Sequence, residues 1–205
     1  MNVIEKYKDA KISAVIRTDD KDCSLRVAKA LIAGGIDVIE ITVENPEMYP
    51  VVRELCETTD ATIVAGGVIT ARQAQEVIKA GVKAVVSPIY APNLVRLCQA
   101  KHTYAITTAT TPNEAYQAWK SGVPLIKIFP VHQMGGAAYI EDLLRPMPFL
   151  NVIATGSIKI EDIADYLNAG ACAVAIGRDF WKDSTDEEIT QKAQAVVQMV
   201  KDISL

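Results

Sequence analysis

The sequence lacks any apolar run near the roughly 18 residues that a membrane-spanning helix needs, and it lacks an excess of basic residues. Its formal net charge is -4, which argues against a general nucleic-acid-binding protein, because such a protein needs a basic face. The two histidines, His102 and His132, form no HxxxH pattern, and the four cysteines form no CxxC pair. Neither a metal site nor a Cys–His nucleophile is therefore predicted.

Half of the 205 residues are hydrophobic, which is enough for a substantial core and excludes a disordered or low-complexity chain. The N-terminal segment MNVIEKYKDAK reaches Glu5 and Lys6 before any apolar stretch, so it does not look like a signal peptide. We expect a cytoplasmic protein whose four cysteines are reduced and mostly packed in the interior.

Short apolar runs alternate with longer segments of helical period along the chain. The runs are β-branched and apolar on both faces, as parallel strands covered by helices must be. Helical periods include 24–33, 71–80, 112–120, 161–169 and a last helix at 187–202. The predicted strands are Ile12–Ile16, Val38–Thr42, Thr62–Ala65, Ala84–Ser87, Thr103–Ile106, Leu125–Phe129, Asn151–Ala154 and Ala173–Ile176.

This alternation predicts an α/β protein with a (β/α)8 TIM barrel. Several predicted helices end in glycine just before the next strand, as in AGGIDV at 33–38, which suits short connections. No linker rich in Pro, Ser or charge divides the chain, so we expect one barrel domain over residues 1–205. An open doubly wound sheet is the rival, but the GxGxxG turn it requires is replaced by Arg17-Thr18-Asp19-Asp20.

Charged residues stand within two of the predicted strands, Glu40 in VIEIT and Lys127 in LIKIF. An ionised group inside a barrel costs on the order of several kcal/mol unless it is paired or neutralised. Both residues lie near the C-terminal ends of their strands, where barrels place their chemistry, and Lys127 shares a face with Leu125 and Phe129. A structural ion pair is one interpretation. The other is Schiff-base chemistry, in which a desolvated neutral amine attacks a carbonyl and a carboxylate moves protons.

Glycine-bearing turns follow the seventh and eighth predicted strands, at Ala154-Thr155-Gly156-Ser157 and Ile176-Gly177-Arg178-Asp179. Barrels often hold a phosphate at these turns through backbone N–H groups. Ser157 would add a hydroxyl and Arg178 a charge. Ordinary connecting turns are the alternative, and Arg178 would then be a surface or interface residue.

Six motifs stand in order along the chain: AVIR at 14–17, GGIDVIEIT at 34–42, VAGGVIT at 64–70, VSP at 86–88, LIKIFP at 125–130 and ATGSI at 154–158. Together they resemble the aldolases of 2-keto-3-deoxy-6-phosphogluconate and 4-hydroxy-2-oxoglutarate over roughly residues 10–200. The KxFP element with an upstream EIT is the most specific part.

The resemblance implies a class I aldolase that forms a lysine Schiff base with pyruvate and needs neither a metal nor an organic cofactor. It implies a homotrimer of (β/α)8 barrels acting on a small-molecule 2-keto acid. It assigns the Schiff base to Lys127 and general acid–base chemistry to Glu40, and it places Arg17 near the substrate carboxylate.

The same resemblance implies roles for residues around this pair. Pro88 and Phe129 would shape the pyruvate pocket, and Thr155 would hydrogen-bond the substrate. Gly156 corresponds to the first glycine of the phosphate loop, followed by Ser157.

The chain also departs from the family pattern at positions that would contact substrate. Gly67 replaces a threonine, Glu44 stands where many members have an arginine, and Arg178 stands where a small residue is expected. These departures leave the Lys127–Glu40 pair intact but put the identity of the substrate in question.

We therefore expect a lyase that cleaves a 2-keto-3-deoxy(-6-phospho) sugar acid or 4-hydroxy-2-oxoglutarate to pyruvate and an aldehyde. One alternative is a phosphosugar epimerase or isomerase on a similar barrel, which would form no lysine adduct. The other is a non-catalytic ligand-binding or assembly protein on an aldolase scaffold, which Gly67, Ser157 and Arg178 would suggest.

Overall fold

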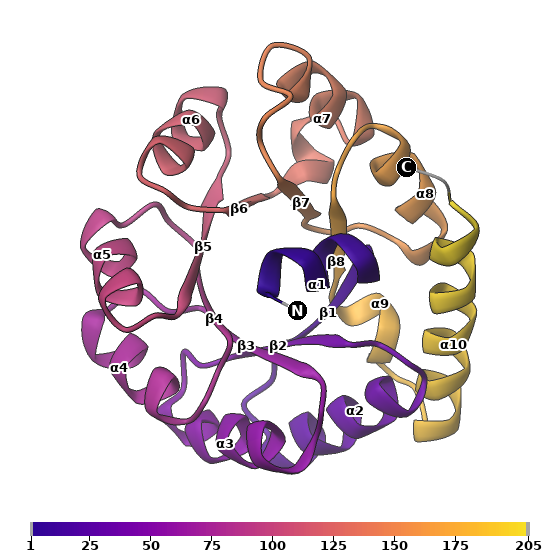
Figure 1. The fold of residues 1–205 in the computed structure, drawn as a ribbon. Coiled ribbons are helices and arrows are strands. Elements are labelled where there is room, and N and C mark those ends of the chain that lie inside the picture. Colours follow the sequence, from indigo (N-terminus) through magenta and orange to yellow (C-terminus); the bar gives the residue numbers. More distant parts are fainter. Residues whose placement is uncertain (1, 204–205) are drawn as a thin grey trace.

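Eight parallel strands close into a ring in the computed structural model, which describes residues 2–203 (Figure 1). Each strand pairs with the next one along the chain, and β8 pairs with β1. This closure confirms the predicted (β/α)8 barrel and excludes the open sheet. The strands are β1 (Ile12–Ile16), β2 (Val38–Thr42), β3 (Thr62–Gly66), β4 (Ala84–Ser87), β5 (Tyr104–Ala109), β6 (Leu125–Ile128), β7 (Val152–Thr155) and β8 (Ala173–Ile176).

Helices cover the outside of the ring, because each presents an apolar face that packs on the outward-pointing strand residues (Figure 1). Three short 3-10 turns interrupt the connections: η1 (Pro46–Met48), η2 (Val131–Met134) and η3 (Ile160–Asp162). The outer helices are α2 (Lys21–Ala33), α3 (Tyr49–Thr58), α4 (Ala71–Lys79), α5 (Pro92–Ala100), α6 (Pro112–Lys120), α7 (Ala137–Leu144), α8 (Ile163–Asn168), α9 (Arg178–Trp181) and α10 (Asp186–Asp202).

Helix α1 (Val3–Ala10) lies apart from this outer layer and within the ring of strands in Figure 1. Its residues Val3 and Tyr7 are buried against inward-facing strand residues such as Val38 and Leu125. A capping box between Asn2 and Glu5 fixes the start of this helix. Helix α1 therefore fills the amino-terminal end of the barrel and leaves the opposite end for ligands.

Most predicted elements agree with the structure within two residues, but β5 was predicted too short. The expected strand at 103–106 runs instead from Tyr104 to Ala109. Thr107 and Thr108 extend it because β-branched threonines suit a pleated sheet, and the Thr108 hydroxyl donates to the carbonyl of Ser87 on β4 at 2.8 Å.

Helix starts also differ from the prediction where a side chain caps the backbone. Helix α2 begins at Lys21 rather than at 24, because the Asp20 carboxylate accepts the N–H of Cys23. The segment predicted as one helix at 161–169 is divided into η3 and α8. The predicted glycine stops are confirmed by positive φ angles at Gly35, Gly81, Gly122 and Gly170.

The helix lengths and the cysteine environments can be described directly from the structure. None of the helices within residues 2–203 combines the length and the apolar character needed to cross a bilayer. All four cysteines are free, and Cys98 is buried while the others are partly buried. Burial raises the pKa of Cys56 and Cys98 to about 11 and that of Cys172 to about 12, so these thiols stay protonated near neutral pH.

Candidate active site

A cavity of about 770 Å³ opens at the carboxyl-terminal ends of the strands, the end of a barrel that carries its chemistry. The structure brings all the predicted site residues to this one cavity, although they come from six different strands and their following segments. Their roles stay predictions. The residues are Arg17, Glu40, Pro88, Lys127, Phe129, Thr155, Gly156, Ser157, Gly177 and Arg178.

Lys127 of β6 and Glu40 of β2 meet inside this cavity from strands on different sides of the barrel. The Lys127 Nζ lies 2.5 Å from the Glu40 Oε2, and each side chain is only 5% exposed. Gly66 at the end of β3 makes room for the carboxylate, since a Cβ there would stand 2.3 Å from the Glu40 Oε1. The two charged groups therefore satisfy each other where water has little access.

Thr108 is a buried polar residue beside this pair that the sequence analysis did not single out. It lines the cavity and lies directly across from Lys127 in the β5–β6 register. Its hydroxyl donates to the Ser87 carbonyl, which leaves the oxygen lone pairs free to accept. A polar residue near the end of a predicted strand would have indicated Thr108. The predicted strand ended at residue 106, however, so Thr108 fell outside it.

The wall beyond β6 is formed by Phe129, a residue that is 48% exposed and lines the cavity. The hydroxyl of Thr110 donates to the Phe129 carbonyl at 2.8 Å, which ties this wall to the loop after β5. Pro88 lines the cavity from the end of β4. Exposed apolar surface next to buried charge is typical of a ligand pocket.

The turn after β7 packs tightly against the segment after β6. Gly156 has φ +111°, and a Cβ there would stand 2.9 Å from the Cα of Pro130, so only glycine fits without movement. Ser157 follows with φ +56°, and its side chain is exposed toward the cavity mouth. The Thr155 hydroxyl donates to the Ala175 carbonyl at 3.2 Å, which joins this turn to β8.

Three further charged residues line the same side of the cavity and were missed from the sequence, Lys159, Asp179 and Lys182. Asp179 accepts the Ile160 N–H at 2.8 Å and lies 3.1 Å from the Lys159 Nζ. Burial opposes ionisation of Asp179, but the Ile160 N–H and Lys159 outweigh it and hold the pKa of this carboxyl below its usual range. Their positions in the sequence, within or shortly after the two glycine-bearing turns, could have indicated that they line the cavity.

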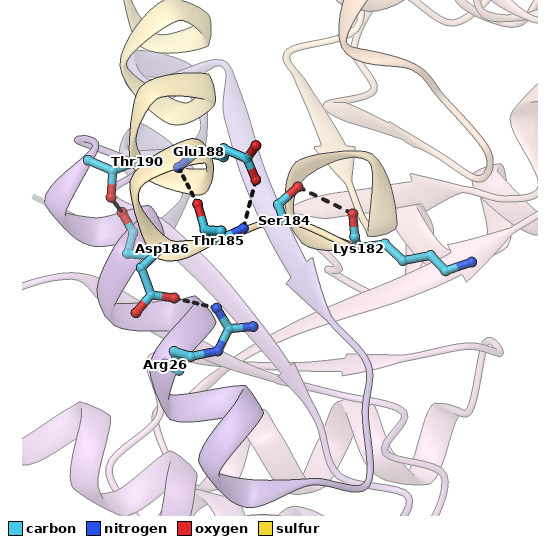
Figure 2. Close-up of polar contacts among 8 residues, drawn as sticks. Arg26, Lys182, Ser184, Thr185, Asp186, Glu188 and Thr190 are labelled. Carbon is cyan, nitrogen blue, oxygen red and sulfur yellow. Dashed lines mark hydrogen bonds and ion pairs between the residues drawn. The ribbon is translucent and has the colours of Figure 1, made fainter.

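The segment after α9 is anchored to the outer helices, as Figure 2 shows. Thr185 and Glu188 form a capping box at the start of α10, and Asp186 pairs with Arg26 of α2. These contacts fix the chain just beyond Lys182. Helices α2 and α10 therefore hold in place the segment that carries this cavity-lining lysine.

Among residues 2–203, no three His, Cys, Asp or Glu side chains converge in a way that could hold a metal ion. The barrel and its cavity of buried and mouth-lining charges at the carboxyl ends of the strands define a class of protein, an enzyme of the (β/α)8-barrel type.

Known proteins of this class include close matches to the chain. Residues 3–198 match the profile of an aldolase family described as KDPG and KHG aldolase. The chain is 31% identical over 205 residues to the 2-dehydro-3-deoxy-phosphogluconate aldolase of Haemophilus influenzae, with 97% of each chain covered. It is 26% identical to the 2-dehydro-3-deoxy-6-phosphogalactonate aldolase of Escherichia coli, over 92% of this chain and 94% of that protein.

A solved structure agrees with these relatives. The KDPG aldolase from Legionella pneumophila, with pyruvate captured as a covalent carbinolamine intermediate, matches with a TM-score of 0.87 at 25% identity. The match covers 96% of this chain and 98% of that one. The chain therefore belongs to the KDPG and KHG aldolase family, and it is a carbon–carbon lyase.

Proposed function

We propose that this lyase cleaves a 2-keto-3-deoxy sugar acid, with or without a 6-phosphate, or 4-hydroxy-2-oxoglutarate, through a Schiff base on Lys127. The products are pyruvate and an aldehyde. The observation that carries this proposal is the 2.5 Å contact between Lys127 and Glu40 inside the cavity. The substrates named for the relatives and the carbinolamine in the Legionella structure support it.

Bond formation starts at the Lys127 amine. Once its proton has passed to Glu40 or to water, the nitrogen attacks C2 of the 2-keto acid and forms a carbinolamine. Glu40 then returns a proton to the departing hydroxyl, and loss of water leaves an iminium. The short Lys127–Glu40 contact supports this exchange, because both groups already share one hydrogen bond.

Bond cleavage uses the same carboxylate, directly or through one water. Glu40 takes the proton from the C4 hydroxyl, the C3–C4 bond breaks, and its electron pair moves into the iminium to give an enamine. The aldehyde leaves, the enamine carbon is protonated, and water releases pyruvate from Lys127. The iminium is the electron sink, so the proposed route requires no additional cofactor.

Cationic side chains line the β7–β8 side of the cavity. Their presence supports a substrate that carries an anionic group at the end far from its keto group. Arg178 and Lys182 line this side, and Lys159 neutralises Asp179 there. Guanidinium and ammonium groups bind phosphate or carboxylate. A 6-phosphate substrate, releasing glyceraldehyde 3-phosphate, is our first choice, and 4-hydroxy-2-oxoglutarate, releasing glyoxylate, is the second.

Reduction with borohydride in the presence of pyruvate tests the Schiff base. We expect a covalent adduct that peptide mass spectrometry locates on Lys127. Lys127→Met should lose the adduct. Lys159→Met is the matched control and should keep it, because Lys159 lines the same cavity but has a largely exposed side chain.

An adduct on another lysine, or none at saturating pyruvate, would contradict the proposal and favour the epimerase alternative. Turnover is measured as pyruvate released from the candidate 2-keto acids. An adduct without turnover of any candidate would favour a ligand-binding protein on an aldolase scaffold.

We also propose that the chain assembles as a homotrimer, as the family resemblance implies. An exposed aromatic cluster on the single chain supports self-association, because contiguous exposed apolar surface commonly marks an interface. Its members, Tyr116, Trp119 and Phe149, pack on one another and are exposed.

A further inference from the structure

Glu44 lies between Arg17 and Gly67, two residues that line the cavity and that follow the strands on either side of β2. Glu44 lies beyond the end of β2, and its Oε1 is 3.2 Å from the Nη2 of Arg17, which follows β1. On its other side is Gly67, which follows β3 and where a Cβ would stand only 2.5 Å from the Glu44 carboxyl carbon. A side chain at 67 would displace the carboxylate, so this glycine and this glutamate fit together.

Arg17 faces into the cavity just above the reactive layer. Val15 pairs with Glu40 in the β1–β2 register, and both line the cavity. Arg17 is two residues further along the same face, about 7 Å toward the mouth at the rise of an extended chain. A carboxylate held above Glu40 is within reach of the flexible Arg17 side chain.

The other cations of the cavity are less suited to the carboxylate of a 2-keto acid. This carboxylate is bonded to the carbon that Lys127 attacks, so it must lie close to the Lys127–Glu40 pair. Lys159 is paired with Asp179, while Arg178 begins α9 and Lys182 follows it, on the β7–β8 side of the cavity. Arg17 directly follows β1, which pairs with the β2 strand of Glu40, and its only ion-pair partner among residues 2–203 is Glu44.

Resting on the Schiff-base function proposed above, we propose that Glu44 is a specificity-determining residue that lowers the affinity of the site for the substrate carboxylate by holding Arg17. Before binding, Arg17 pairs with Glu44; on binding, the 2-keto acid competes for the same guanidinium. The Arg17 and Glu44 side chains are 65% and 51% exposed. A pair so exposed changes an equilibrium by about two- to fivefold, weak enough for a ligand to displace.

Glu44→Gln tests this proposal, because glutamine keeps the shape and an accepting oxygen but removes the charge. We expect the pyruvate concentration that half-saturates borohydride trapping to fall about two- to fivefold. The KM of the cleaved 2-keto acid should fall in step, so the effect lies in KM rather than in kcat. In an Arg17→Ala background the same substitution should have no effect, because Glu44 acts through Arg17.

Glu54→Gln is the matched control, since Glu54 forms a similar exposed pair with Lys29 at 3.0 Å on the outer helices. It should leave trapping unchanged. An unchanged or higher half-saturating concentration in Glu44→Gln, or an equal effect with and without Arg17, would overturn the proposal. Absence of any adduct in the unmodified protein would instead overturn the proposed function, so the two failures are distinguishable.

Discussion

At the scale of single residues, burial makes Lys127 and Glu40 depend on each other. Each side chain is 5% exposed, and each is the only salt-bridge partner of the other among residues 2–203. Removing one partner leaves the other charge desolvated and unpaired, which typically costs about 3–5 kcal/mol. Residues needed for the proposed chemistry thus also determine stability.

Lys127→Met should lower the free energy of unfolding by about 3 kcal/mol at pH 7, because Glu40 stays buried without a partner. Urea unfolding followed by circular dichroism measures this loss. Adding Glu40→Gln removes the stranded charge, so the double variant should be more stable than Lys127→Met alone.

The exposed pair of Lys29 and Glu54 provides the control for this comparison. Lys29→Met should change the free energy of unfolding by no more than about 0.5 kcal/mol, because exposed pairs contribute little. Equal stabilities of Lys127→Met and its double variant would contradict the interpretation of a mutually dependent pair.

At the scale of elements, the turn between β5 and α6 supports the wall of the cavity. The Glu114 carboxylate accepts the N–H groups of Thr110 and Thr111, each at 2.8 Å, and Thr111 caps α6 in return. The Thr110 hydroxyl in turn donates to the Phe129 carbonyl. The start of one helix therefore positions a residue that follows the next strand.

The stability contributed by Glu114 should depend on pH. The N–H groups of Thr110 and Thr111 lower the pKa of Glu114 below its unfolded value of about 4.3. Its contribution is therefore present above that pH and is lost as the pH falls through the folded-state pKa. Glu114→Gln should be less stable than the unmodified protein at pH 7, and this difference in urea midpoint should shrink toward pH 3.

Thr111→Ala removes the other half of the capping box without removing a charge. It should lower the free energy of unfolding by about 0.5–2 kcal/mol at neutral pH. The difference in urea midpoint between Glu114→Gln and the unmodified protein is predicted to shrink on acidification. A difference that grew instead would contradict the predicted sign of the Glu114 contribution.

At the scale of the whole molecule, an exposed aromatic cluster supports the assembly proposed above. Trp119 on α6 and Phe149 pack with their ring centroids 4.5 Å apart, and Tyr116 stacks on Trp119. All three are more than one third exposed on the single chain. Aromatic clusters of this kind are common in protein interfaces.

Sedimentation velocity should find a species with the mass of three 22.2 kDa chains. Its mass should stay constant on moderate dilution, because a proposed permanent assembly buries apolar surface on every subunit. A monomer or dimer across the concentration range would contradict the proposed trimer.

The elements were predictable because their patterns are local. Apolar runs such as Val38–Thr42 and Ala173–Ile176 match the observed strands at both ends. Period-two alternation placed Lys127 on the face of Leu125, and Leu125 is indeed inside the barrel. The prediction for β5 ended too early because it followed apolar residues, whereas the β-branched Thr107 and Thr108 continue the strand and the Thr108 hydroxyl bonds to β4.

The sequence by itself determined the alternation of strands and helices, and it marked Lys127 and Glu40 as charges in apolar strands, because side-chain periodicity acts over a few residues. Only the tertiary structure decided that these two charges meet, since 87 positions separate them and closure of the barrel sets their distance. It likewise decided that Glu44 lies between Arg17 and Gly67. Contacts between distant segments follow from packing and register, which no local pattern encodes.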